Sequence, residues 1–158
     1  MAAATLLHRL LVVCAVAAAF QLRPDMLYRL PPLRAALSPT EARENIQTIY
    51  DGVIDVRMSA EHRLEGRIVD SICIPAQLWE HGMYLPRDAF VPDVLEQFET
   101  DCRLLCVCGD GRRSELAAQQ LANAGFSVDY IDGGLNAWAE QSLPLEVEDD
   151  GGLVGSYV

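Results

Sequence analysis

The sequence predicts an α/β fold, in which helices cover both faces of a mainly parallel β-sheet. Short apolar runs alternate along the chain with runs that carry helix-capping or Ala-rich helical patterns. The strand candidates are continuously apolar, which is typical of strands covered on both faces. With 158 residues, 51% of them hydrophobic, the chain is long enough for one ordinary domain with its own core. Together these observations favour a single α/β domain.

The first elements are predicted from capping and turn residues. Residues 38–41, Ser-Pro-Thr-Glu, combine an N-cap serine, a first-turn proline and a glutamate three residues on, and they predict a helix that runs to about Thr48. The β-branched run at 53–56 follows an Asp-Gly turn and predicts a buried strand. Ser59 is expected to cap a short helix through Glu65.

The middle of the chain is less regular. Residues 71–74 predict a strand that is closed by a proline, and residues 76–87 are expected to form a loop with at most one helical turn. Residues 92–98 predict a helix with an apolar face.

The last elements repeat the alternation of strand and helix. Strands are predicted at 103–107 and 128–131, and helices at 113–124 and 135–140. Gly125 ends the first of these helices. Trp138 is expected to pack on the sheet.

The two ends of the chain are expected to lie outside the domain. Residues 1–19 are typical of a secretory signal peptide, and residues 20–37 suit a second, transit-like segment or a linker. The junction between them resembles the cleavage motif of two-part plastid (chloroplast) leaders; a secretory or endomembrane leader and a mitochondrial transit peptide are the alternatives. The apolar run is too short to span a bilayer, so no stable membrane span is expected after cleavage. The domain is expected at 38–145, and residues 146–158 to form an acidic, Gly-rich disordered tail.

Charge and cysteine content exclude several function classes. The net charge is −11, and residues 1–40 are net positive, so the rest of the chain is strongly acidic and repels nucleic acid. The cysteines lack the spacing of a zinc site or a disulfide framework, and neither a metal nor another cofactor is expected. Reduced thiols, one of them reactive, are the simplest interpretation. The five cysteines are Cys14, Cys73, Cys102, Cys106 and Cys108.

One cysteine stands where a predicted strand passes into a predicted helix. The segment is Cys108-Gly109-Asp110-Gly111-Arg112-Arg113-Ser114. Backbone N–H groups at a helix N-terminus and two arginines favour an anion there, so we expect the Cys108 thiol to be partly ionised and nucleophilic. Gly109 and Gly111 allow a tight loop around the sulfur.

Three motifs in order resemble those of a single rhodanese domain. Val53-Ile54-Asp55-Val56-Arg57 resembles its first conserved strand, residues 108–114 its active loop, and Asp132-Gly133-Gly134-Leu135-Asn136-Ala137-Trp138 its closing segment. The resemblance covers about residues 37–145 and implies a rhodanese-like three-layer fold with a central five-stranded sheet. Asp70 stands where the family has a second glycine, and Arg67 where it has a histidine.

The resemblance implies a sulfurtransferase of the thiosulfate sulfurtransferase type. Cys108 would take a sulfane sulfur from a small-molecule donor of the thiosulfate or 3-mercaptopyruvate class, hold it as a persulfide, and pass it to a thiol or cyanide; the acceptor can also be a protein. Residues 109–114 would bind the donor's anion. Asp55 and Arg57 are expected to be structural residues near the site.

Two further residues qualify the choice of donor. Asp110 opposes an anionic donor by charge repulsion. Glu61 falls where the long thiosulfate and mercaptopyruvate enzymes have a donor-holding arginine, although Arg63 can substitute for it. We therefore expect weak thiosulfate binding.

Two other function classes compete with the sulfurtransferase. The first is a non-catalytic or regulatory rhodanese-like binding module that keeps the thiol incidentally. The second is a Cys-dependent phosphatase or arsenate reductase, which is less favoured because four residues separate Cys108 from Arg113, where those enzymes have five.

Overall fold

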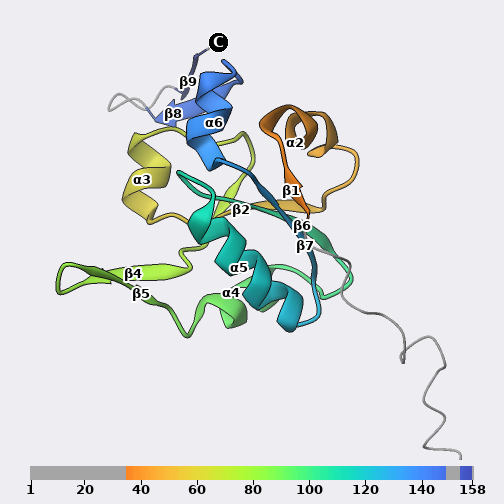
Figure 1. The fold of residues 1–158 in the computed structure, drawn as a ribbon, viewed down its shortest axis with the longest axis vertical. Helices are drawn as coiled ribbons and strands as arrows, with labels where there is room; N and C mark the ends of the chain where they lie inside the picture. The colour runs from red at the N-terminus through yellow and green to blue at the C-terminus, as the bar shows by residue number, and fades with distance from the viewer. Residues whose placement is uncertain (1–34, 149–153, 158) are drawn as a thin grey trace, which may run out of the picture. The chain divides into compact units, whose positions relative to one another are not determined.

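The computed structural model describes residues 35–148 and 154–157, and its centre is a five-stranded parallel sheet (Figure 1). The strand order is β1-β7-β6-β2-β3, and each adjacent pair is parallel. The strands are β1 (Ala36–Leu37), β2 (Gly52–Asp55), β3 (Ile72–Cys73), β6 (Arg103–Val107) and β7 (Ser127–Ile131). The predicted α/β class and the five-stranded, mainly parallel sheet are confirmed.

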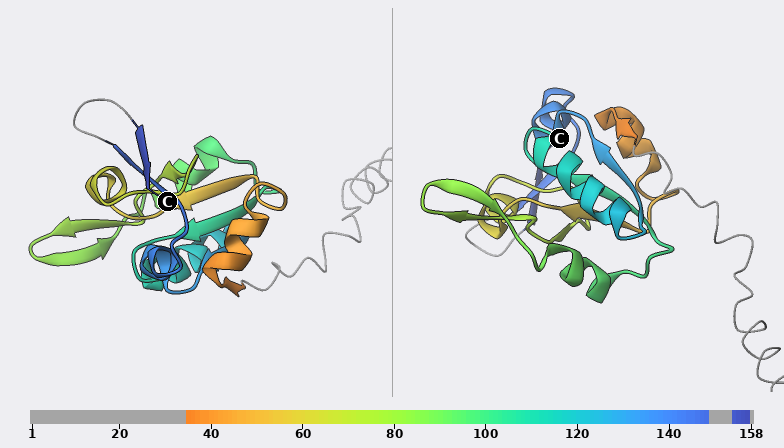
Figure 2. Two further views of the ribbon diagram at one scale, coloured as in Figure 1. Left: turned by 90° about the horizontal axis from the view of Figure 1, so that it is seen from above. Right: turned by 60° about the horizontal axis from the view of Figure 1, so that its bottom comes forward.

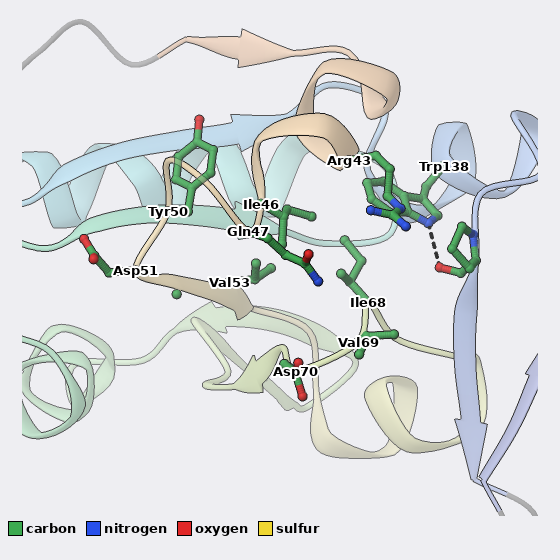
Figure 3. A pocket seen from close by; sticks show the side chains of 12 residues that line it. Arg43, Ile46, Gln47, Tyr50, Asp51, Val53, Ile68, Val69, Asp70 and Trp138 are labelled. Atoms are coloured by element: carbon green, nitrogen blue, oxygen red, sulfur yellow. Dashed lines mark hydrogen bonds between the residues drawn. The ribbon is translucent and has the colours of Figure 1, made fainter.

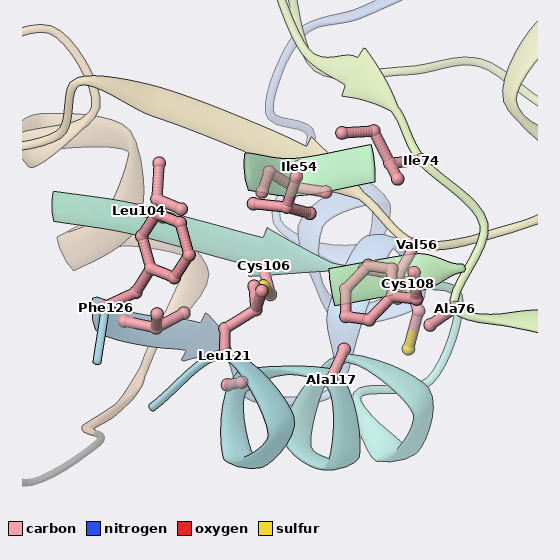
Figure 4. Packing of buried hydrophobic residues seen from close by; sticks show 14 residues of the cluster. Ile54, Val56, Ile74, Ala76, Leu104, Cys106, Cys108, Ala117, Leu121 and Phe126 are labelled. Atoms are coloured by element: carbon pink, nitrogen blue, oxygen red, sulfur yellow. The ribbon is translucent and has the colours of Figure 1, made fainter. Parts of the chain in front are cut away.

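Helices cover both faces of this sheet and produce three layers. The helices are α2 (Pro39–Asn45), α3 (Ser59–Leu64), α4 (Phe90–Gln97), α5 (Arg112–Asn123) and α6 (Gly134–Glu140). One apolar cluster joins α4 and α5 to alternate residues of the central strands, as Figure 4 shows for α5. The second cluster joins α2 and α6 to the opposite face, where the predicted packing of Trp138 on the sheet is observed.

Local sequence rules account for the helix starts, although several boundaries differ from expectation. At Ser38 the predicted capping box is present, but α2 ends at Asn45, before the expected Thr48. The N-cap of α3 is Met58 and not Ser59, because the Glu61 carboxylate accepts the Met58 backbone N–H at 2.9 Å. Helix α4 begins at Phe90, two residues earlier than predicted.

The predicted loop at 76–87 is wrong, because this segment forms an antiparallel hairpin. Strands β4 (Gln77–Glu80) and β5 (Met83–Pro86) pair directly, and the hairpin extends away from the sheet (Figure 2). His81 and Gly82 have φ values of 51° and 79°, as a two-residue hairpin turn requires. Trp79 and Tyr84 lie opposite each other with ring centroids 4.7 Å apart, which adds a cross-strand aromatic contact.

The expected disordered tail is also wrong where the structure describes it. Strand β8 (Leu145–Glu148) pairs with β9 (Val154–Tyr157). Arg67 and Glu146 exchange two backbone hydrogen bonds of 2.8 Å, and their side chains form an ion pair at 3.6 Å. Leu145 packs against the second apolar cluster. These contacts hold the start of the segment against the domain.

The segment that was expected to precede the domain contributes one strand. Strand β1 lies within residues 20–37 and pairs with β7, and the Ala35 N–H donates to Asp129 at 2.8 Å. The leader at 1–19 and the rest of the transit-like segment lie outside the described residues. Asp70 has a φ of 60°, which lies in the left-handed region that glycine adopts most readily. Among the helices that the structure describes, none is both long and apolar enough to cross a membrane.

Candidate active site

Cys108 lies directly after β6, the central strand of the sheet, at its carboxyl end. Parallel α/β sheets place their ligand sites at this end. Cys106 and Cys108 point to the α5 side of the sheet (Figure 4), and both residues are fully buried. Burial raises the pKa of the Cys106 thiol, which suits a core residue.

The sulfur of Cys108 is surrounded by hydrogen-bond donors from the start of α5. The backbone N–H groups of Gly111 and Ser114 donate to Sγ at 3.2 and 3.3 Å. The Ser114 hydroxyl lies 3.4 Å from Sγ and donates to the Gly111 carbonyl at 2.9 Å. The Asp110 carboxylate lies 3.8 Å from Sγ on the exposed side of the loop. Backbone donors aimed at a sulfur atom stabilise a thiolate, so the arrangement suits a sulfur nucleophile.

The closing motif fixes the shape of this loop. The N–H groups of Leu135 and Asn136 donate to the carbonyls of Cys108 and Gly109 at 2.8 and 2.9 Å. A Cβ atom on Gly134, whose φ is +58°, would overlap the Cys108 carbonyl oxygen and lie 2.7 Å from the Gly109 carbonyl oxygen. The glycine therefore permits the close approach that turns the loop carbonyls towards α6 and leaves loop N–H groups for the sulfur.

Arg113 is held by a carboxylate on α3. Its Nη1 and Nη2 donate to the two Glu61 carboxylate oxygens at 2.9 and 2.6 Å. This pair lowers the pKa of the Glu61 carboxyl and raises the pKa of the Arg113 guanidinium. The guanidinium also lies over the Tyr84 ring, 5.3 Å from its centroid. Arg113, one of the residues expected to bind the donor's anion, thus forms an ion pair with Glu61 in this structure.

Arg112 points outward and pairs with the loop's own carboxylate. Its side chain is 86% exposed, and its Nε lies 3.2 Å from an Asp110 oxygen. Asp110 also accepts the Arg112 backbone N–H at 3.2 Å. Arg113 is likewise paired with Glu61, so the two positive and two negative charges of these four side chains cancel.

Asp55 and Arg57 form a buried pair beside the loop. Asp55 accepts the backbone N–H of Arg57 at 3.0 Å and three side-chain bonds from the same residue, at 3.0 and 3.1 Å from Nε and at 2.8 Å from Nη2. Arg57 also donates to the Gly66 carbonyl at 2.6 Å. The pair ties the end of β2 to the turn after α3.

Two residues of the site were not predicted in the places that they occupy. In the sequence Glu61 stands out only as a departure from the long family members, although its position in the first turn of α3 is a capping signal. Tyr84 lies on the hairpin that was expected to be loop, and alternating aromatic residues around a His-Gly turn were the available signal. The four cysteines of the described part are free thiols, and no group of three or more His, Cys, Asp or Glu side chains within that part could hold a metal ion.

A separate cavity of about 250 Å³ lies between α2 and the segment before β3 (Figure 3). It includes Gly52 at the amino end of β2, whereas Cys108 follows the carboxyl end of the neighbouring strand β6. Its lining includes Ile46, Val53, Ile68 and Trp138, and none of the predicted site residues.

Comparisons with known proteins agree with the motifs. The family model of the rhodanese-like domain matches residues 38–141. The chain is 45% identical over 53 residues to thiosulfate sulfurtransferase GlpE from Vibrio cholerae, which covers 33% of this chain and 50% of that protein. It is 30% identical over 106 residues to rhodanese-like domain-containing protein 15, chloroplastic, from Arabidopsis thaliana, covering 66% of this chain and 57% of the relative. The chain thus spans about half the length of the curated relatives it matches.

A solved structure shares the fold. The crystal structure of a rhodanese-related protein from Thermoplasma volcanium is 26% identical to this chain, with a TM-score of 0.56. The match covers 70% of this chain and 95% of that one.

Proposed function

The chain belongs to the rhodanese-like domain family, and from this premise we propose that it is a sulfurtransferase that carries sulfur as a persulfide on Cys108. The observation that carries the proposal is the pair of backbone N–H groups that donate to Sγ at 3.2 and 3.3 Å. The same donors stabilise the Cys108 thiolate before it attacks the donor and again when Cys108 leaves as the thiolate in the second displacement. The likeness to thiosulfate sulfurtransferase GlpE supports the reaction class.

The reaction proceeds in two displacements. The Cys108 thiolate attacks the sulfane sulfur of a small-molecule donor, a new S–S bond forms, and the bond from that sulfur to the rest of the donor breaks with its electron pair. An acceptor thiolate or cyanide then attacks the outer sulfur, and Cys108 leaves as the thiolate. The backbone N–H groups of Gly111 and Ser114 serve both displacements, because Cys108 is a thiolate at the start of the first and at the end of the second. Donors of the thiosulfate or 3-mercaptopyruvate class and small or protein acceptors fit this scheme.

Mass spectrometry tests the proposal directly. The protein is incubated with thiosulfate and, separately, with 3-mercaptopyruvate, and the Cys108 peptide is examined for one added sulfur atom. We expect the adduct from at least one donor, and its loss on reduction. Cys108→Ser is the control for cyanide turnover. If neither of these donors nor benzenethiosulfonate gives an adduct, and cyanide turnover equals that of Cys108→Ser, the protein is not an enzyme of this kind.

A second candidate is the non-catalytic binding module, and the β4–β5 hairpin favours it. The hairpin carries several exposed apolar side chains, namely Leu78, Trp79, Met83, Tyr84 and Leu85. Exposed apolar clusters of this kind serve as protein contacts. Under this alternative no donor modifies Cys108, and Cys108→Ser leaves partner binding unchanged.

We also propose a plastid location. The Arabidopsis relative is named as chloroplastic, and the sequence pattern of residues 1–37 suits a two-part leader. A fusion of residues 1–37 to a fluorescent protein should enter plastids. Accumulation in the secretory pathway or in mitochondria would favour the corresponding alternative leader.

A further inference from the structure

The charge at the Cys108 loop differs from what the loop sequence alone suggests. The loop carries two arginines and one aspartate, but Glu61 from α3 binds Arg113 through both carboxylate oxygens. The Arg113 and Glu61 side chains are 17% and 20% exposed, so this ion pair is partly shielded from water. Arg113 Nη2 lies 3.6 Å from the position of a Cβ on Gly109, which places the pair directly over the loop.

The other arginines near the loop are also occupied. Arg112 pairs with Asp110 at its exposed end, and Arg57 is buried against Asp55. Arg63 is exposed and lies two residues after Glu61, so it projects from a different side of α3. The loop thus offers an anion its backbone N–H groups but no uncompensated arginine.

The surface next to the ion pair is aromatic. Tyr84 lies under the Arg113 guanidinium, and Trp79 packs on Tyr84 with ring centroids 4.7 Å apart. Both rings are about half exposed. A donor at this loop therefore meets a neutral ion pair and an apolar wall.

We infer that Glu61 is a positioning residue that determines which donor charge the site prefers. By neutralising Arg113 it makes the site prefer a singly charged sulfane-sulfur donor with an apolar body, such as an organic persulfide or thiosulfonate, over dianionic thiosulfate. This inference rests on the proposed sulfurtransferase function and identifies the donor class of the same site.

The chemistry is the same for each donor except for charge. The Cys108 thiolate forms a bond to the donor's terminal sulfur, and the bond from that sulfur to the rest of the donor breaks. The electron pair leaves with sulfite from thiosulfate, with sulfinate from a thiosulfonate, or with a thiolate from an organic persulfide. Charge balances in each case without an oxidant or reductant. Sulfite carries two negative charges and the other leaving groups carry one.

The test compares thiosulfate with benzenethiosulfonate as probes. Glu61→Gln keeps the shape of the side chain but leaves the Arg113 charge uncompensated. We expect kcat/KM for thiosulfate, divided by that for benzenethiosulfonate, to rise about fivefold in Glu61→Gln, because the extra charge attracts the dianion more strongly. Glu65→Gln is the matched control, since it removes the same charge at the end of α3 from a side chain that is 64% exposed and pairs with Arg57, at 3.5 Å, and not with Arg113. Its ratio should stay within twofold of the unsubstituted protein.

A second measurement uses the unsubstituted protein and does not depend on the folding of a variant. Because the chain has a net charge of −11 and the loop adds no positive charge, rising ionic strength should increase kcat/KM for thiosulfate more than for benzenethiosulfonate. A thiosulfate rate that falls with salt would show a positively charged site and overturn the inference. An unchanged donor ratio in Glu61→Gln would also overturn it, even where both donors form the persulfide. If neither donor forms it, the proposed function itself fails.

Discussion

Gly134→Ala tests whether the closing motif fixes the Cys108 loop. The added Cβ would overlap the Cys108 carbonyl oxygen, and both neighbours are backbone atoms that cannot turn aside. Moving the loop away would break two hydrogen bonds, of 2.8 and 2.9 Å, from the start of α6 to the loop carbonyls. Each bond contributes about 1 kcal/mol, and a left-handed alanine costs about 1–2 kcal/mol. We expect a loss of about 3–4 kcal/mol in the free energy of unfolding.

Gly125→Ala is the matched control for this variant. Gly125 also has a positive φ, +102°, but a Cβ there meets nothing within 4 Å. Its free energy of unfolding should fall only by the cost of a left-handed alanine, about 1–2 kcal/mol. Urea unfolding followed by circular dichroism measures both, and the midpoint for Gly134→Ala should fall about 1 M below that for Gly125→Ala. Equal midpoints would refute the argument that the loop and the closing motif are packed backbone against backbone.

Three further predictions concern charged residues. Asp110→Ser should raise kcat/KM for thiosulfate about threefold, because one repelling charge near the sulfur is removed; steady-state kinetics that show no change would contradict the repulsion. Asp55→Asn should lower the free energy of unfolding by about 3–5 kcal/mol, because it leaves the buried Arg57 charge with only the largely exposed Glu65 carboxylate, at 3.5 Å, as a charge partner; a loss below 1 kcal/mol in urea unfolding would exclude this. The pKa of Glu61 is lowered by Arg113 in the folded state, so the unfolded chain binds the proton first as pH falls. The stability that Glu61 adds over Glu61→Gln is therefore present above its ordinary pKa of 4.5 and should disappear as pH falls through the lower folded value; a constant difference from pH 7 to pH 3 would contradict this.

The sequence predicted those parts of the fold that depend on neighbours along the chain. The structure contains three such local patterns. They are the Ser38 capping box, the transition from strand β6 to helix α5, and the end of that helix before Gly125. The position of Cys108 at the carboxyl end of a strand followed from the same alternation. Such features need only a few consecutive residues, so one sequence is enough to find them.

What the sequence could not predict depends on residues that are far apart along the chain. Glu61 and Arg113 are 52 positions apart, and only the folded sheet brings α3 against the start of α5. The two backbone bonds between Arg67 and Glu146 likewise order a segment whose acidic, Gly-rich composition favours disorder. The β4–β5 hairpin was missed for a different reason, because a His-Gly turn is a weaker hairpin signal than Asn-Gly.

The strand order has a consequence for how the molecule opens. Both edges of the sheet, β1 and β3, are strands of two residues, and β6 is the middle strand. Short edge strands fray readily, whereas the amide groups of a fully enclosed strand exchange with water only when the whole domain unfolds. Thermal opening at either edge therefore leaves the strand before Cys108 undisturbed. Hydrogen exchange should be slowest in β6, and the motions that bring reactants to the thiol should come from the loop and the hairpin and not from the sheet.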